Sequence, residues 1–152
     1  MMYKKILLTL DGSENSKRAA EHAINISDIN NADIAVLFVV EPYYPRLATL
    51  PIDIPKENYY IDIRDEGKKI LKDFDNKLEE NKSQGKCQNI NITCLIKDGK
   101  AYIEIFNAMD KENVDLVVMG ASGSHNVLDR ITLGSVTERV IREARIPVIV
   151  IP

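Results

Sequence analysis

The sequence predicts a three-layer α/β sandwich built around a five-stranded, mostly parallel sheet. Short, nearly continuous apolar runs, typical of strands buried on both faces, alternate with segments whose apolar residues recur at helical spacing. Glycine and serine residues follow several of these runs, where a parallel sheet has its ligand-binding edge. The chain has a length usual for one domain and no internal repeat, so residues 1–152 are predicted to form a single domain.

Composition and charge limit the classes of partner. The 152 residues are 45% hydrophobic and 28% charged, as in ordinary soluble proteins. The 20 basic and 23 acidic side chains give a net charge of −3, and the basic ones are scattered, which argues against a nucleic-acid partner. No apolar run approaches the roughly 20 residues that span a bilayer, so no membrane partner is expected.

The first apolar run and the cysteines predict a cytoplasmic protein. The run is interrupted by Thr9 and Asp11, which makes it too short for the core of a secretory signal. Cys87 and Cys94 are too few for a disulfide framework and lack metal-ligand spacing. We therefore interpret them as free thiols in or near a strand.

Two strands and a helix are predicted in the first third of the chain. Residues 3–10 and 32–40 are near-continuous apolar runs, as expected for buried parallel strands. Between them, Ser13 has the side chain of a helix N-cap, and apolar residues at helical spacing follow it. Asn30 and Asn31 are predicted to end this helix.

Residues 41–60 interrupt the regular order. Four prolines and four tyrosines are interleaved there, and proline at this density opposes a regular helix or a central strand. We predict a variable loop, which is either a lid or partner surface or a plain irregular connection. A helix with one apolar face is predicted for residues 62–82.

The remaining sequence predicts three strands and two helices. Alternation of apolar and polar residues over 90–96 predicts an edge strand with one exposed face. Residues 114–119 and 148–151 are short apolar runs typical of buried strands. Helices are predicted directly after Lys100 and over residues 135–144.

Three of the predicted strands end in residues that suit a binding site. These ends are residues 9–13, 39–41 and 119–123. Right-handed crossovers bring the carboxyl ends of parallel strands to one rim, where ligands bind if the strand order reverses. We therefore expect these three segments to meet.

The glycine-rich turn Gly120-Ala-Ser-Gly123 and the pair Gly134-Ser135 have the composition of an anion site. Glycine allows positive φ and leaves room for a phosphate to approach the backbone. A helix that begins at Ser135 would present free N–H groups and the positive end of its dipole. The alternative is that Gly120 and Gly123 only shape a tight turn and that Ser135 is merely an N-cap.

Several motifs together resemble the universal stress protein family. The glycine turn is followed by a spacer, by Gly-Ser-Val-Thr-Glu-Arg-Val-Ile from Gly134, and by Pro-Val-Ile-Val-Ile-Pro at residues 147–152. The opening Tyr-Lys-Lys-Ile-Leu-Leu-Thr-Leu-Asp-Gly-Ser-Glu and the run Val-Asp-Leu-Val-Val-Met-Gly also match. The resemblance covers the chain except residues 41–60 and extends to the family's ATP-binding branch.

The resemblance implies a Rossmann-like sheet in the order 3-2-1-4-5 and a homodimer formed through the last strand, residues 147–152. It also implies a site for ATP, in which residues 9–11 border the adenosine and Val39 packs on the adenine. Asp11 would reach the ribose or a Mg²⁺ that bridges phosphate oxygens. The predicted site residues are Thr9, Leu10, Asp11, Val39, Met119, Gly120, Gly123, Ser124, His125, Gly134, Ser135 and Val136.

The chain departs from the family pattern in one place. The spacer from Ser124 to Leu133 has ten residues, one more than the family's usual spacing. The extra residue falls near Ser124 and His125, beside the expected phosphates. His125 is interpreted as a loop residue or phosphate contact rather than a catalytic base, because a base must first lie within reach of its proton.

Several enzyme classes are excluded by missing motifs. The chain has no Gly-x-x-x-x-Gly-Lys-Ser/Thr run for a P-loop and only Gly12 where a dehydrogenase needs Gly-x-Gly-x-x-Gly. The turn around Ser122 lacks the final glycine of a nucleophile elbow. A phospho-receiver domain would pair a second acidic residue with Asp11, and that residue is missing here. No catalytic residue is assigned, and ATP hydrolysis is expected to be slow at most.

Two functions remain at this level. The first is an ATP-binding sensor or switch in the stress response, and the retained glycines favour it. The second is a structural or interaction dimer of the same fold that binds no nucleotide. A slow ATPase or adenylate kinase-like enzyme comes third.

Overall fold

The computed structural model describes residues 2–42, 56–122 and 133–152, and within them five strands form one sheet in the order β3-β2-β1-β4-β5. All four neighbouring pairs are parallel, so the predicted architecture is confirmed and the sheet is parallel throughout. The strands are β1 (Lys5–Thr9), β2 (Asp33–Val40), β3 (Ile92–Asp98), β4 (Leu116–Gly120) and β5 (Val148–Ile151). The helices are α1 (Glu14–Asn30), α2 (Lys56–Ser83), α3 (Ala101–Lys111) and α4 (Ser135–Glu143).

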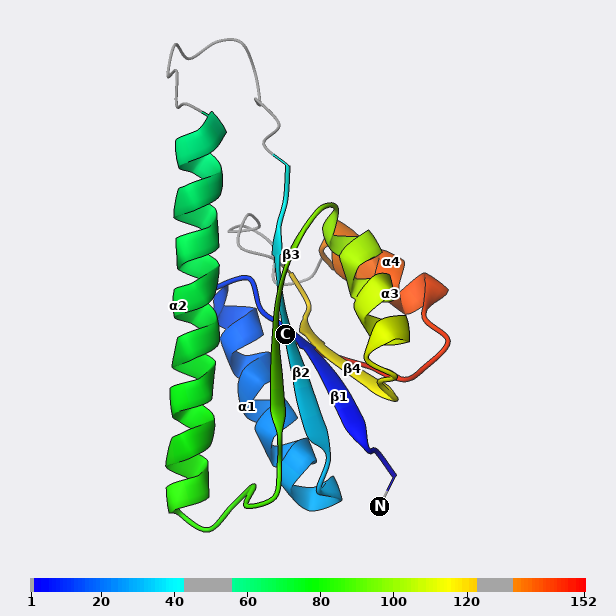
Figure 1. Ribbon diagram of the computed structural model, residues 1–152. Coiled ribbons are helices and arrows are strands. Elements are labelled where there is room, and N and C mark those ends of the chain that lie inside the picture. Colours follow the sequence, from blue (N-terminus) through cyan, green and yellow to red (C-terminus); the bar gives the residue numbers. More distant parts are fainter. Residues whose placement is uncertain (1, 43–55, 123–132) are drawn as a thin grey trace.

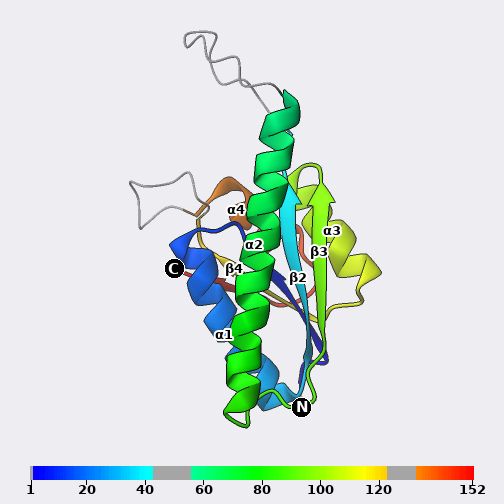
Figure 2. The same cartoon turned by 60° about the vertical axis from the view of Figure 1, so that its left-hand side comes forward.

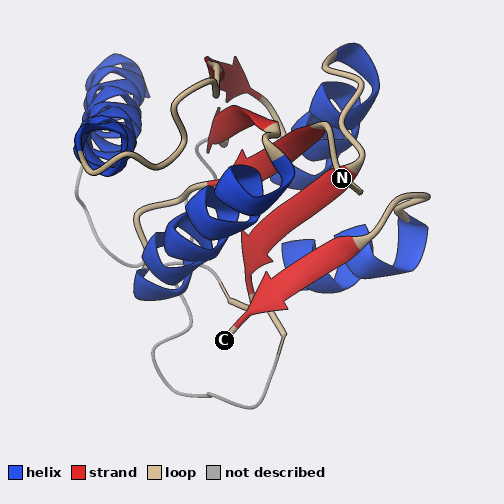
Figure 3. Ribbon diagram, turned by 90° about the horizontal axis from the view of Figure 1, so that it is seen from below, coloured by secondary structure: helices blue, strands red, loops and turns tan. Residues whose placement is uncertain are grey.

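The helices cover both faces of the sheet. In Figure 1, α1 and α2 lie on one side and α3 and α4 on the other, and Figure 3 shows the strands as the layer between them. Each face has its own core cluster, because successive residues of a strand point to opposite faces. On β1, Ile6 and Leu8 belong to the cluster under α1 and α2, while Leu7 belongs to the cluster under α3 and α4.

The ends of α1 follow the predicted sequence signals. The Ser13 hydroxyl accepts a hydrogen bond from the Ser16 N–H at 3.2 Å, which is the expected N-cap. Asn31 ends the helix in the left-handed conformation at φ 52°, which asparagine tolerates better than most residues. Both predictions of helix boundaries are therefore confirmed.

The predicted C-terminal boundary of the loop over residues 41–60 is wrong. Helix α2 begins at Lys56, so Tyr59 and Tyr60 are helical. The reason is that Pro55 is the last proline of the segment, and no proline after it interrupts a helix. Residues 43–55 lie outside the described part of the chain. Figure 2 shows that the amino end of α2 extends beyond the sheet.

Strand β3 occupies the edge of the sheet, as its alternating pattern predicts, but runs from Ile92 to Asp98 rather than over 90–96. Cys94 lies exposed on β3, and Cys87 is buried in the connection before it. Both are free thiols, as predicted, and desolvation raises the pKa of the buried Cys87 thiol. No helix in the described ranges combines the length and apolar character needed to cross a bilayer.

Candidate functional site

The carboxyl ends of β1 and β4 lie side by side at the middle of the sheet. From β1 the chain continues to β2 and β3 on one side, whereas β4 leads to β5 on the other. This reversal is the topological switch point at which parallel α/β sheets bind ligands. The predicted residues Thr9 and Gly120 are the last residues of these two strands.

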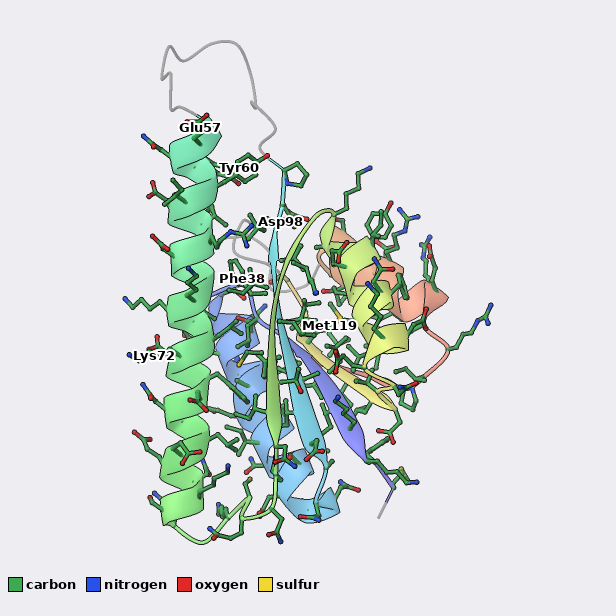
Figure 4. All side chains as sticks on the ribbon, viewed as in Figure 1. Phe38, Glu57, Tyr60, Lys72, Asp98 and Met119 are labelled. Carbon is green, nitrogen blue, oxygen red and sulfur yellow. The ribbon has the colours of Figure 1, made fainter. Side chains whose placement is uncertain are left out.

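The predicted apolar site residues share one face of the sheet. Thr9 is paired with Leu37, which belongs with Met119 to the cluster under α3 and α4. Val39 and Val136 are half-buried against the same cluster. Figure 4 shows Met119 on this side of the sheet, opposite Phe38. The structure thus brings Thr9, Val39, Met119 and Val136 to one side of the switch point.

Leu10 and Asp11 are placed differently from these residues. The Leu10 side chain is buried in the other cluster, under α1 and α2, so only its backbone remains for a ligand on the α3 and α4 side. Asp11 is exposed, and its Oδ1 accepts a hydrogen bond from the Ser13 N–H at 2.9 Å. Within the described ranges, no three His, Cys, Asp or Glu side chains are grouped to hold a metal ion.

Helix α4 begins at Ser135, as predicted, and its N-cap is Gly134 rather than Ser135. Gly134 has no side chain that could cap the helix, and the first intrahelical bond runs from the Glu138 N–H to the Gly134 carbonyl at 2.9 Å. In the described part of the chain, no side-chain oxygen accepts from the N–H groups of the first turn, residues 135–137. A helix start of this kind can receive an anion.

At the N-termini of α1 and α3, side-chain oxygen atoms already accept hydrogen bonds from backbone N–H groups. At α1, the Ser13 hydroxyl caps the first turn and Glu14 adds a negative charge. At α3, the Glu41 carboxylate at the end of β2 accepts from the Ala101 N–H at 3.2 Å. Of these three helices, α4 therefore has the N-terminus best suited to an external anion.

Gly120 has a packing role that the sequence did not predict. A Cβ added to this residue would lie 2.9 Å from Asn15 Cβ and 3.1 Å from the Asn15 carbonyl carbon and the Ser16 nitrogen. Real Cβ atoms essentially never approach as closely as the first of these distances. Gly120 is thus required for the close approach of β4 to the first turn of α1, whatever the ligand.

Sequence reasoning also missed two polar side chains beside the glycine turn. Asn15 Nδ2 donates to Ser122 Oγ at 2.6 Å, and the buried Thr137 hydroxyl donates to the Gly120 carbonyl at 2.9 Å. The signal for Thr137 was its place in the first turn of α4, where a hydroxyl can reach a neighbouring carbonyl. Asn15 gave no signal, because its partner is 107 residues away. Gly123, Ser124 and His125 lie outside the described residues.

An open depression of about 440 Å³ lies beyond the carboxyl ends of β2 and β3. Its lining consists of Val40, Pro42, Tyr60, Asp98 and Gly99. Tyr60 and Asp98 appear near the upper end of the sheet in Figure 4. The depression adjoins the end of β2 but not the switch point itself.

The fold and this edge define a Rossmann-like α/β protein with a candidate ligand site where β1 and β4 end. The universal stress protein family matches residues 2–152, and the chain belongs to this family. One relative, universal stress protein MJ0531 of Methanocaldococcus jannaschii, is 35% identical over 150 residues, covering 99% of this chain and 82% of the relative.

Solved structures of the family share the fold. The universal stress protein UspA from Lactobacillus plantarum has a TM-score of 0.82 at 24% identity and covers 100% of this chain and 99% of its own. A universal stress protein in complex with cAMP has a TM-score of 0.70 at 22% identity, and the match covers 100% of this chain and 99% of that protein's chain. A family protein from Arabidopsis thaliana with AMP bound has a TM-score of 0.62 at 22% identity, and the match covers 97% of this chain and 90% of that protein's chain.

Proposed function

We propose that the protein binds an adenine nucleotide, ATP, at the carboxyl ends of β1 and β4 and acts as a cytoplasmic sensor or switch in the stress response. The observation that carries this proposal is the start of α4, where the N–H groups of the first turn meet no side-chain oxygen among the described residues. Members of the family hold cAMP or AMP in solved structures, which supports the nucleotide class.

The adenosine would occupy the apolar side of the site. Val39 offers a half-buried aliphatic surface for the adenine ring, and Met119 and Val136 belong to the same cluster. Thr9 and the backbone of Leu10 would border the adenosine from β1. The exposed Asp11 carboxylate would bind either the ribose hydroxyls or a magnesium ion on the phosphates, because a carboxylate is both a strong hydrogen-bond acceptor and a ligand of Mg²⁺.

The phosphates would lie against Gly134, Ser135 and the first turn of α4. The exposed Ser135 hydroxyl would add a donor to the backbone N–H groups there. Gly123, Ser124 and His125 belong to the same proposal as residues beside the phosphate chain. Their placement rests on the resemblance in sequence.

A magnesium ion would accompany ATP in this proposal. Mg²⁺ keeps several water molecules and needs only one or two carboxylates besides the phosphate oxygens. Asp11 can supply one such carboxylate, which fits a metal carried by the nucleotide better than a metal held by the protein alone. The ion would neutralise phosphate charge.

Replacing Ser135 with aspartate tests the proposed phosphate position. The new carboxylate stands at the helix N-terminus, where a negative charge stabilises the helix by about 0.3–1 kcal/mol but repels a phosphate. We expect Ser135→Asp to weaken Mg-ATP binding by at least about tenfold, without loss of stability. Isothermal titration calorimetry measures the affinity, and urea denaturation measures the stability.

The matched control is Ser83→Asp, the same substitution at the last residue of α2, far from the carboxyl edge of the sheet. This variant should bind Mg-ATP like the wild type. If Ser135→Asp binds equally well, the phosphates do not lie at α4. If both variants lose binding, the effect is one of net charge.

The edge strand β5 supports a second proposal, a homodimer through residues 147–152. Val148, Ile149 and Val150 are half-buried, and β5 pairs only with β4 in the described sheet. An apolar edge strand exposes unpaired backbone groups unless another chain covers it. Native mass spectra at micromolar concentration are expected to show two chains per particle. A strict monomer would contradict this proposal.

A further inference from the structure

We propose that Thr137 is a positioning residue for the phosphate site and that its hydroxyl fixes the first turn of α4 against the end of β4. The inference rests on the proposed function, because it concerns the site in which ATP would bind. Thr137 is 4% exposed, and its Oγ1 donates to the Gly120 carbonyl at 2.9 Å. It is the third residue of α4 and so lies in the turn whose N–H groups would receive the phosphates.

The Gly120 carbonyl is a fixed reference point. On one side, Gly120 lies so close to α1 that an added Cβ would be 3.1 Å from the backbone of Asn15 and Ser16. On the other, β4 and β5 remain paired through the next residue, since the Ala121 N–H donates to the Ile151 carbonyl at 2.7 Å. A helix that is hydrogen-bonded to this carbonyl is therefore held in a fixed position relative to the sheet and to α1.

Two of the described hydrogen bonds join the start of α4 to Gly120 and to Ala121, the residue that follows it. The Thr137 hydroxyl reaches Gly120, and the Gly134 N–H donates to the Ala121 carbonyl at 2.8 Å. The backbone bond fixes the N-cap, and the Thr137 bond fixes the orientation of the turn that follows. Hydrogen bonds to a phosphate weaken when donors are displaced by about 0.5 Å, so this orientation determines affinity.

Thr137→Val and Thr137→Ser separate the hydroxyl from the shape of the side chain. Valine keeps the volume and removes the donor, whereas serine keeps the donor. We expect Thr137→Val to weaken Mg-ATP binding about fivefold or more and to leave adenosine binding within about twofold of the wild type. Thr137→Ser should bind Mg-ATP like the wild type. Mg-ATP and adenosine are titrated separately, under conditions in which circular dichroism shows that all variants are folded.

A purely structural role would lower the melting temperature without this selective loss for the phosphate-bearing ligand. Thr93→Val is the matched control: it is the same change on β3, which is the edge strand farthest from β5 in the sheet order, and it should not alter either affinity. If Thr137→Val does not fold, Thr137→Ala replaces it with the same expectation. Wild-type affinity for Mg-ATP in the folded variant, or an equal loss for adenosine, overturns the inference. Failure of the wild type to bind Mg-ATP defeats the proposed function itself.

Discussion

Replacing Gly67 with alanine is expected to lower the free energy of unfolding by about 2 kcal/mol, although alanine is the better helix former. Gly67 lies inside α2, and a Cβ added there would overlap Phe38 Cδ1 and lie 2.7 Å from Phe38 Cε1. Phe38 is 5% exposed in the core under α1 and α2, so its ring has little room to move. The steric cost therefore exceeds the gain of roughly 1 kcal/mol in helix propensity. Urea denaturation measures the difference.

The double variant Gly67→Ala with Phe38→Leu tests this cause. Leucine is smaller than phenylalanine and leaves space for the new methyl group. We expect the double variant to be more stable, by about 1 kcal/mol or more, than the sum of the two single effects. Additive losses would show that contact with Phe38 is not the reason for glycine at position 67.

Replacing Gly120 with alanine is expected to lower the free energy of unfolding by about 2–3 kcal/mol in the absence of any nucleotide. The new Cβ meets backbone atoms of Asn15 and Ser16 at 3.1 Å, so α1 and β4 must move apart. Such a movement disturbs a packed core rather than one flexible side chain. Thermal or urea denaturation of the nucleotide-free protein gives the value.

Gly120 and Gly67 should differ in how they are rescued. The obstacle at Gly67 is a side chain, whereas the obstacle at Gly120 includes the first turn of α1 itself. Shortening the side chain with Asn15→Ala keeps its Cβ and backbone, so it should not restore the stability of Gly120→Ala. A Gly120→Ala variant as stable as the wild type would show that packing of β4 against α1 does not require glycine at position 120.

The order of elements was predictable because each strand and helix carries its own local signal. The sequence predicts Ser13 as an N-cap, and its hydroxyl does accept a hydrogen bond from the Ser16 N–H. Continuous apolar runs predicted buried parallel strands, and the alternation before Lys97 predicted the edge position of β3. The start of α2 differs from the prediction because Tyr59 and Tyr60 follow the last proline of that segment and are helical.

The contacts made by the glycines were not predictable from local sequence. Gly67 faces Phe38 across 29 positions of the chain, and Gly120 faces Asn15 across 105. A single sequence does not reveal which distant residues will approach so closely. For the same reason, the sequence predicted Gly120 as part of a phosphate turn but not as a contact between β4 and α1.

The candidate site was predictable in outline. The switch point and the start of α4 followed from strand order and from the pair Gly134-Ser135. The division of residues between the two faces of the sheet was not foreseen, and it leaves Leu10 with only its backbone toward the site. Thr137 was not predicted because its hydrogen-bond partner is the carbonyl of a residue in another element.

Native mass spectrometry of freshly purified protein tests the central claim most directly. We expect part of the wild-type protein to carry the added mass of ATP, with or without magnesium, and denaturation to release an adenine nucleotide. The Ser135→Asp variant, purified in the same way, should carry clearly less nucleotide than the wild type. Wild-type protein without any adenine nucleotide, together with no heat of binding on titration with Mg-ATP, would contradict the claim and favour a structural dimer.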